Sequence, residues 1–203
     1  MQKIIICGIN DLYQLGEKSN NETLDGYYET PIISPPKNSS LDASSILSYS
    51  IYGCHAVVIT KNNELLATGE NYDKRIFSSL GHKFHEQFTK FEIKDNHNQI
   101  LCPISVVCGF YFTLYIVQSI NNSNETKLLY SYNSIKSNDP LFLNIGCYKP
   151  VSLFGGWYTS AVIDDEGSVI FIPESENIKK KSVVNARSKL SSRWRNSCLC
   201  CML

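Results

Sequence analysis

The stretch VVCGFYFTLYI, residues 106–116, decides the fold of this 203-residue chain, because its plan occurs three times. In each copy a glycine is followed, after one residue, by His or Tyr, and then by an apolar run, a polar break and a second apolar run. These kernels centre on Gly53, Gly109 and Gly156, spaced 56 and 47 residues apart. Paired apolar runs joined by a short polar turn predict a β-hairpin in every copy.

Further strands are predicted around these hairpins. An apolar or proline-marked entry precedes each one, at residues 46–48, 103–105 and 150–152. Gly167 can supply the positive φ that the third hairpin turn needs. The run Ile4–Asn10 matches Leu65–Asn71 and predicts a half unit at the start of the chain. A period near 50 residues built from short strands is typical of propeller blades, so we expect an all-β, incomplete β-propeller of about three and a half blades of antiparallel strands.

Helical signals are weak. The best candidates, Asp42–Ser48 and Phe84–Phe91, are short and do not sustain a 3.6-residue period. The segments Ser19–Ser40 and Lys94–Gln99 are rich in turn-forming residues and predict surface loops.

The segment GINDLYQLG, residues 8–16, resembles the signature Gly-x-Asn-x-x-Gly-Gln-Leu-Gly of the regulator of chromosome condensation repeat family, with Tyr13 as its one departure. A weaker copy stands at Gly69–Ile76, and the resemblance spans about residues 1–175. Two features depart from the family pattern. The family places two residues between its kernel glycine and a His, where this chain has one, and the later units lack the Gly-x-Asn motif.

This resemblance implies blades of a seven-bladed propeller, and the best-known member of the family is the nucleotide-exchange factor for the small GTPase Ran. At about 50 residues a blade, 203 residues cannot close such a ring. An open arc would bind a partner, assemble with copies of itself, or be a piece of a longer protein, and we favour the piece. We therefore predict a non-enzymatic protein-interaction module, with guanine-nucleotide exchange on a Ran-like GTPase as the alternative.

Composition narrows the partners. Nineteen basic and nineteen acidic residues balance, so no nucleic-acid partner is expected. No apolar run approaches the length of a membrane span, which predicts a cytoplasmic or nuclear protein whose eight cysteines are mostly thiols.

No residue pattern predicts catalysis, a cofactor or a metal. Cys54 and His55 are neighbours in a predicted strand and would point to opposite faces. The acidic run 164–166 precedes Gly167 at a hairpin tip, where carboxylates are usually solvated. His82 and His85 lack further ligands at a metal spacing and predict a surface loop. The glycine-rich pieces lack the strand-loop-helix setting of nucleotide sites.

Loops on a rigid scaffold usually carry recognition, so the loop after the second run of the first repeat is the predicted partner-binding site. Its residues are Tyr72, Asp73, Lys74 and Arg75.

Beyond residue 178 the repeat stops. We predict that residues 179–203 form a disordered basic tail ending in Cys200-Cys201-Met202-Leu203. That ending fits a prenylation box at Cys200, and terminal Leu favours geranylgeranyl. Lipidation there would attach the protein peripherally to a membrane, with the upstream bases and Cys198 as a second signal. Zinc binding by the tail cysteines is the weaker alternative, since no fourth ligand is near.

Overall fold

The computed structural model describes residues 6–9, 23–28, 45–72, 74–77, 80–81, 84–95, 97–119, 122–132, 141–143, 149–157, 159–172 and 187–189. The strands in these ranges are β1 (Ile6–Ile9), β2 (Thr23–Tyr28), β3 (Ile46–Tyr52), β4 (His55–Thr60), β5 (Leu65–Glu70), β6 (Phe84–Phe91), β7 (Ile93–Lys94), β8 (Ile100–Cys108), β9 (Phe112–Ser119), β10 (Asn122–Tyr132), β11 (Leu141–Leu143), β12 (Pro150–Gly155), β13 (Ser160–Asp164), β14 (Ser168–Ile172) and β15 (Arg187–Lys189). The predicted all-β class is confirmed.

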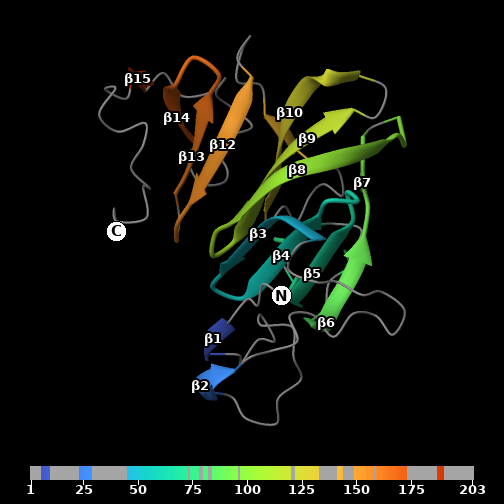
Figure 1. The fold of residues 1–203 in the computed structure, drawn as a ribbon, viewed down its shortest axis with the longest axis vertical. Helices are drawn as coiled ribbons and strands as arrows, with labels where there is room; N and C mark the ends of the chain where they lie inside the picture. Colours follow the sequence, from blue (N-terminus) through green and yellow to red (C-terminus); the bar gives the residue numbers. More distant parts are fainter. Residues whose placement is uncertain are drawn as a thin grey trace.

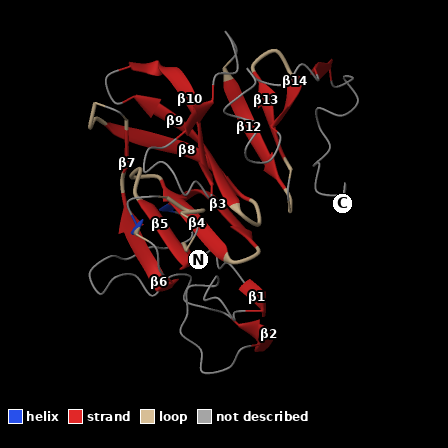
Figure 2. Ribbon diagram, turned by 180° about the vertical axis from the view of Figure 1, so that it is seen from behind, coloured by secondary structure: helices blue, strands red, loops and turns tan. Residues whose placement is uncertain are grey.

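Three antiparallel sheets follow one another along the chain, and within each sheet the strands pair in chain order (Figure 1). The first sheet is β3-β4-β5-β6, the second contains β8-β9-β10-β11, and the third is β12-β13-β14-β15. Strands β1 and β2 form a separate pair. Seen from behind, the same three sheets fan out one after another (Figure 2). These sheets of four, five and four strands, together with the strand pair, match the predicted three and a half blades. The last strand of the third sheet, β15, lies within residues 179–203, the segment predicted to be a disordered tail.

The repeated runs account for the order of strands. The two runs of each repeat form β4 and β5, β9 and β10, and β13 and β14, while the apolar entries upstream form β3, β8 and β12. In the third hairpin Gly167 has a φ of 79° and its N–H donates to the carbonyl of Asp164 at 3.0 Å, as predicted. Each repeat therefore lays down one antiparallel meander.

The hydrophobic core lies between successive sheets, because alternate side chains of a strand point to opposite faces. The layer between the first and second sheets includes Val57, Ile59, Val106, Tyr115 and Val117. The layer between the second and third sheets includes Leu114, Ile116, Leu128, Val162 and Ile170. Strand β9 supplies both layers, so the middle sheet is buried on both faces and the blades form one continuous stack.

Strand β7 links the first two sheets directly. It follows β6 after a single residue, Glu92, and pairs with the start of β8 through Ile93 opposite Leu101 and Lys94 opposite Ile100. The Ile93 side chain is fully buried in the layer between the two sheets. The second sheet thereby gains a fifth strand from the segment that leaves the first.

Neither of the two weak helix candidates forms an α-helix in its described residues. The helix candidate Phe84–Phe91 is strand β6, and the described part of Asp42–Ser48 belongs to the start of β3. Both segments sit beside a neighbouring strand, and this pairing outweighs a weak local pattern in a short apolar run. The predicted loop Ser19–Ser40 contains β2, and its other residues lie outside the described ranges.

Candidate protein-interaction site

The kernel turns of the three blades meet at one end of the stack, and Phe110 joins them. Its ring lies against Gly53 of the first kernel turn so closely that a Cβ on Gly53 would come within 2.7 Å of the Phe110 Cδ2. On its other side the ring stacks on Trp157 of the third kernel turn, with centroids 4.8 Å apart and planes 12° apart. The Phe110 N–H donates to the Trp157 carbonyl at 3.2 Å. We call Phe110, Tyr111 and Trp157 the aromatic rim.

The structure corrects the alignment of the kernels. His55 is the first residue of β4 and is fully buried, but its counterpart at the start of β9 is Phe112, which is 2% exposed. Tyr111, which sequence spacing equated with His55, lies in the turn and is 36% exposed. The second turn is one residue longer than the first, and the two-residue spacing of the repeat family is recovered between Gly109 and Phe112.

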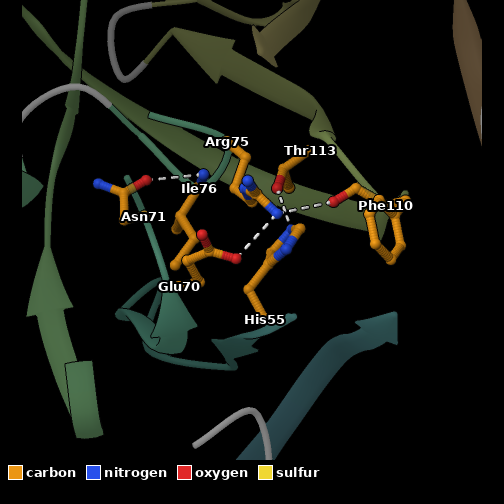
Figure 3. Close-up of polar contacts among 7 residues, drawn as sticks. All are labelled: His55, Glu70, Asn71, Arg75, Ile76, Phe110 and Thr113. Carbon is orange, nitrogen blue, oxygen red and sulfur yellow. Dashed lines mark hydrogen bonds and ion pairs between the residues drawn. The ribbon is translucent and has the colours of Figure 1, made fainter. Parts of the chain in front are cut away.

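The Gly69-Glu70-Asn71 motif has a structural reason in this blade. Gly69 has a φ of 94°, and a Cβ there would overlap the Cys54 carbonyl oxygen. Asn71 is fully buried and holds the loop that follows (Figure 3). Its Oδ1 accepts the N–H of Ile76 at 2.9 Å, and its Nδ2 donates to the Phe77 carbonyl at 2.9 Å. The motif therefore fixes the path of the chain between β5 and β6; Asn10 and Asn133, its predicted counterparts, lie outside the described residues.

Two hydrogen bonds tie this loop to the second blade. The hydroxyl of Tyr115 in β9 donates to the Ile76 carbonyl at 2.8 Å, and the hydroxyl of Ser131 in β10 donates to the Lys74 carbonyl at 2.8 Å. Lys74 itself has a φ of 55°. The hydroxyl groups of two buried side chains, Tyr115 and Ser131, thus hold the loop against the second blade.

Arg75 was predicted to face outward, but its side chain is buried. Its side chain is 3% exposed, and one guanidinium nitrogen, Nη1, lies 3.1 Å from the Glu70 carboxylate and 3.2 Å from the Phe110 carbonyl (Figure 3). The guanidinium also lies over the Tyr111 ring, 5.2 Å from its centroid. A buried cation needs a counter-charge and hydrogen-bond acceptors, and this site supplies both. The Arg75 guanidinium therefore joins the first blade to the second.

His55 lies near this ion pair and contacts the neighbouring blade. Its Nε2 and the Thr113 Oγ1 are 2.8 Å apart, a hydrogen bond between the first and second blades. Burial, reinforced by the charge of Arg75, lowers the pKa of His55 from 6.5 to about 3. The ring is consequently neutral at physiological pH.

The remaining predicted residues divide into two groups. Tyr72 is 39% exposed and Lys74 is half-buried, so the predicted loop presents both at the kernel end. Asp73 lies outside the described residues, as does Cys200. The sequence did not predict that Tyr111 and Trp157 are surface residues, but their side chains are 36% and 51% exposed. The turns at Gly109 and Gly156 are longer than the first kernel turn and lift these side chains off the strands, a difference that the repeat spacing in the sequence does not show.

Other chemically reactive residues are engaged in the fold. The Asp164 carboxylate is buried, and its Oδ1 accepts the N–H of Ser168 at 2.7 Å and that of Glu166 at 3.0 Å. The solvated hairpin tip we expected is therefore wrong for Asp164, whereas Asp165 and Glu166 are exposed. His85 belongs to β6 and is 5% exposed, which corrects the predicted surface loop. Cys54 is buried and lies in the first kernel turn, not in the strand where we had placed it.

The described residues lack two kinds of feature, a metal-binding cluster and a membrane-spanning helix. They contain no group of three or more His, Cys, Asp or Glu side chains that could hold a metal ion. They also contain no helix with the length and hydropathy needed to cross a bilayer.

Comparison with known proteins points to one fold. No family model and no curated protein matches the sequence. Among solved structures, human WBSCR16 superposes with a TM-score of 0.60 at 12% identity, covering 94% of this chain and 54% of that one. Prp20p from Saccharomyces cerevisiae gives 0.57 at 13%, with 86% and 42% covered. Yeast RCC1 (Prp20) bound to Kap60 gives 0.59 at 13%, with 86% and 41% covered.

The chain spans about half the length of these structures, or less. The succession of four-stranded meanders and the structural matches agree on the architecture that the sequence resemblance implied. The described residues therefore have the fold of part of an RCC1-type β-propeller.

Proposed function

We propose that the chain is a non-enzymatic protein-interaction module of the RCC1 type and a portion of a longer propeller. The observation that carries this proposal is the kernel end of the stack, where buried polar contacts fix the loops while Tyr72, Tyr111 and Trp157 stay exposed. Exposed aromatic side chains on a rigid base are typical of protein-binding surfaces.

The structural neighbours support a protein partner. Prp20p binds Gsp1p and histones, and yeast RCC1 (Prp20) binds Kap60. For this chain we propose a cytoplasmic or nuclear protein partner, with membrane attachment only if Cys200 is lipidated.

Site-specific crosslinking tests the module. A photoreactive phenylalanine analogue replaces Tyr72 in one version and Gln87, an exposed residue of β6, in the control. After irradiation in the protein's own cells, we expect a discrete protein adduct from position 72 and none from position 87. Absence of an adduct at 72, or equal labelling at both positions, would refute the proposed binding end.

The intact mass of the protein isolated from those cells tests two further proposals, the longer propeller and the lipidation of Cys200. A mass well above 22.9 kDa is expected for a longer propeller. A mass of 22.9 kDa plus an isoprenoid would reject the longer chain and support lipidation at Cys200.

A second candidate is guanine-nucleotide exchange on a Ran-like small GTPase, which the structural match to Prp20p, a protein that binds Gsp1p, favours. Release of fluorescent GDP from a purified Ran-type GTPase tests it. The non-enzymatic proposal expects the uncatalysed release rate at every concentration of the chain, whereas exchange would raise that rate in proportion to the concentration.

A further inference from the structure

The aromatic rim is a preformed platform of rings. Phe110 and Trp157 form a parallel stack, and Tyr111 stands edge-on to Phe110 with centroids 4.6 Å apart and planes 81° apart. Trp157 is 51% exposed and Tyr111 36%, while Phe110 between them is half-buried. A partner would therefore meet two outer rings whose positions the central ring fixes.

The backbone of the rim is already engaged. The Phe110 N–H bonds to the Trp157 carbonyl, and the Phe110 carbonyl accepts from Arg75. The Gly109 N–H donates to the Phe112 carbonyl at 2.9 Å, and the Gly156 N–H donates to the Thr159 carbonyl at 2.9 Å. A partner strand that needs a row of backbone donors and acceptors finds none of these groups available, so recognition must use the rings.

The positive charge next to the aromatic rim, that of Arg75, is already paired with a carboxylate of the chain itself. Arg75 touches the Tyr111 ring from the protein side and is paired with Glu70 at 3.1 Å. A guanidinium on one face of an aromatic ring already uses the attraction that a second cation would seek on the other face. The rim therefore suits an uncharged segment better than a basic or an acidic one.

An uncharged segment that binds through rings without backbone pairing matches polyproline II recognition. Proline rings pack flat against Trp and Tyr, and the preformed helix loses little conformational entropy on binding. The polyproline II helix has no internal hydrogen bonds, so it presents its proline rings without first breaking backbone contacts of its own.

We propose that Trp157 and Tyr111, braced by Phe110, bind a proline-rich segment of the protein partner in the polyproline II conformation. This inference rests on the proposed function of an interaction module and adds the location and the chemistry of the contact.

The chain offers its own reporter for the test. It contains two tryptophans, so Trp194→Phe leaves Trp157 as the single fluorophore. We expect a fluorescein-labelled decaproline peptide to bind saturably, to raise the anisotropy of the label and to shift the emission of Trp157. A glycine-serine decamer of equal length is expected to do neither.

Variants then locate the contact. Trp157→Ala is expected to weaken decaproline binding at least tenfold by anisotropy, and Tyr111→Ala several-fold. Tyr49→Ala removes another exposed tyrosine, 56% exposed on β3, and should bind as the unmodified chain does. Trp157→Phe keeps a stacked ring and should bind at an intermediate level, which separates loss of contact from loss of folding.

Three results would overturn the inference: no saturable decaproline binding, unchanged binding by Trp157→Ala, or preferential binding of a decalysine or a decaglutamate peptide. Crosslinking from position 72 keeps the two proposals apart. If the partner still crosslinks while decaproline does not bind, the interaction module stands and the polyproline contact fails.

Discussion

Acidification from pH 7.5 to 5.0 is expected to destabilise the fold through His55. The pKa of this ring is 6.5 in its ordinary state and about 3 in the folded chain, because the ring is buried and Arg75 lies near it. Between these values the unfolded chain takes up a proton that the folded chain excludes. Stability is therefore fully present above pH 6.5 and declines as the pH falls toward 3.

The magnitude follows from the same two values. At pH 5.0 the unfolded ring is almost wholly protonated and the folded ring is neutral, so linkage gives a loss of about 2 kcal/mol relative to pH 7.5. With a urea slope of about 2 kcal/mol per molar, the unfolding midpoint should fall by about 1 M. Asp95, whose pKa is lowered chiefly by the backbone N–H of Gln99, acts only at lower pH and stays outside this window.

Urea titrations followed by circular dichroism at several pH values measure this loss, with His55→Gln as the comparison. The variant loses the hydrogen bond between His55 and Thr113, so its urea midpoint should be lower at pH 7.5. Because it also lacks the titrating ring, its free energy of unfolding should fall less steeply between pH 6.5 and 5.0, by about 1.4 kcal/mol per pH unit. Parallel pH profiles for the two proteins would refute the assignment of the acid sensitivity to His55.

Three further predictions concern the glycine, the ion pair and the thiol. Gly69→Ala should cost about 3 kcal/mol or more because of backbone overlap, whereas Gly81→Ala, at φ 74° with open space around it, should cost about 1 kcal/mol; thermal unfolding compares them. Arg75→Met should destabilise by about 3 kcal/mol by leaving Glu70 uncompensated, and adding Glu70→Gln should restore part of this in a double-mutant cycle. Burial raises the pKa of Cys108 to about 12, so mass-spectrometric mapping after brief alkylation of the native protein at pH 8 should find it unmodified.

The fold was largely predictable because its signal is repeated. Gly109 and Gly156 mark turns, the apolar runs after them form β9 and β13, and each copy supports the interpretation of the others. The failures lie where no repeat supports the local pattern. Phe84–Phe91 carries no clear period, and only its pairing with β5 makes it a strand.

The site was less predictable than the fold. Arg75 follows a Gly-x-Asn motif in a segment whose sequence is typical of an exposed loop. Its burial depends on an ion pair with Glu70 and a hydrogen bond to the carbonyl of Phe110, which is 35 residues further along the chain, and the local sequence indicates neither contact. Trp157 was not predicted as a surface residue, because turn length cannot be seen before the strands are paired: two residues separate the paired Tyr52 and His55, whereas four separate Gly155 and Ser160. Contacts between blades decide both outcomes.

Strand β7 has a consequence for how such proteins can be divided. The boundary between the first two sheets falls at a single residue, Glu92, because β6 ends at Phe91 and β7 begins in the second sheet at Ile93. A division of the chain at Glu92 would leave both sets of hydrogen-bonded strands whole. The same division would expose Ile93, because this buried side chain contributes to the layer between the two sheets. The two sheets are therefore separable along the chain but not through their shared core.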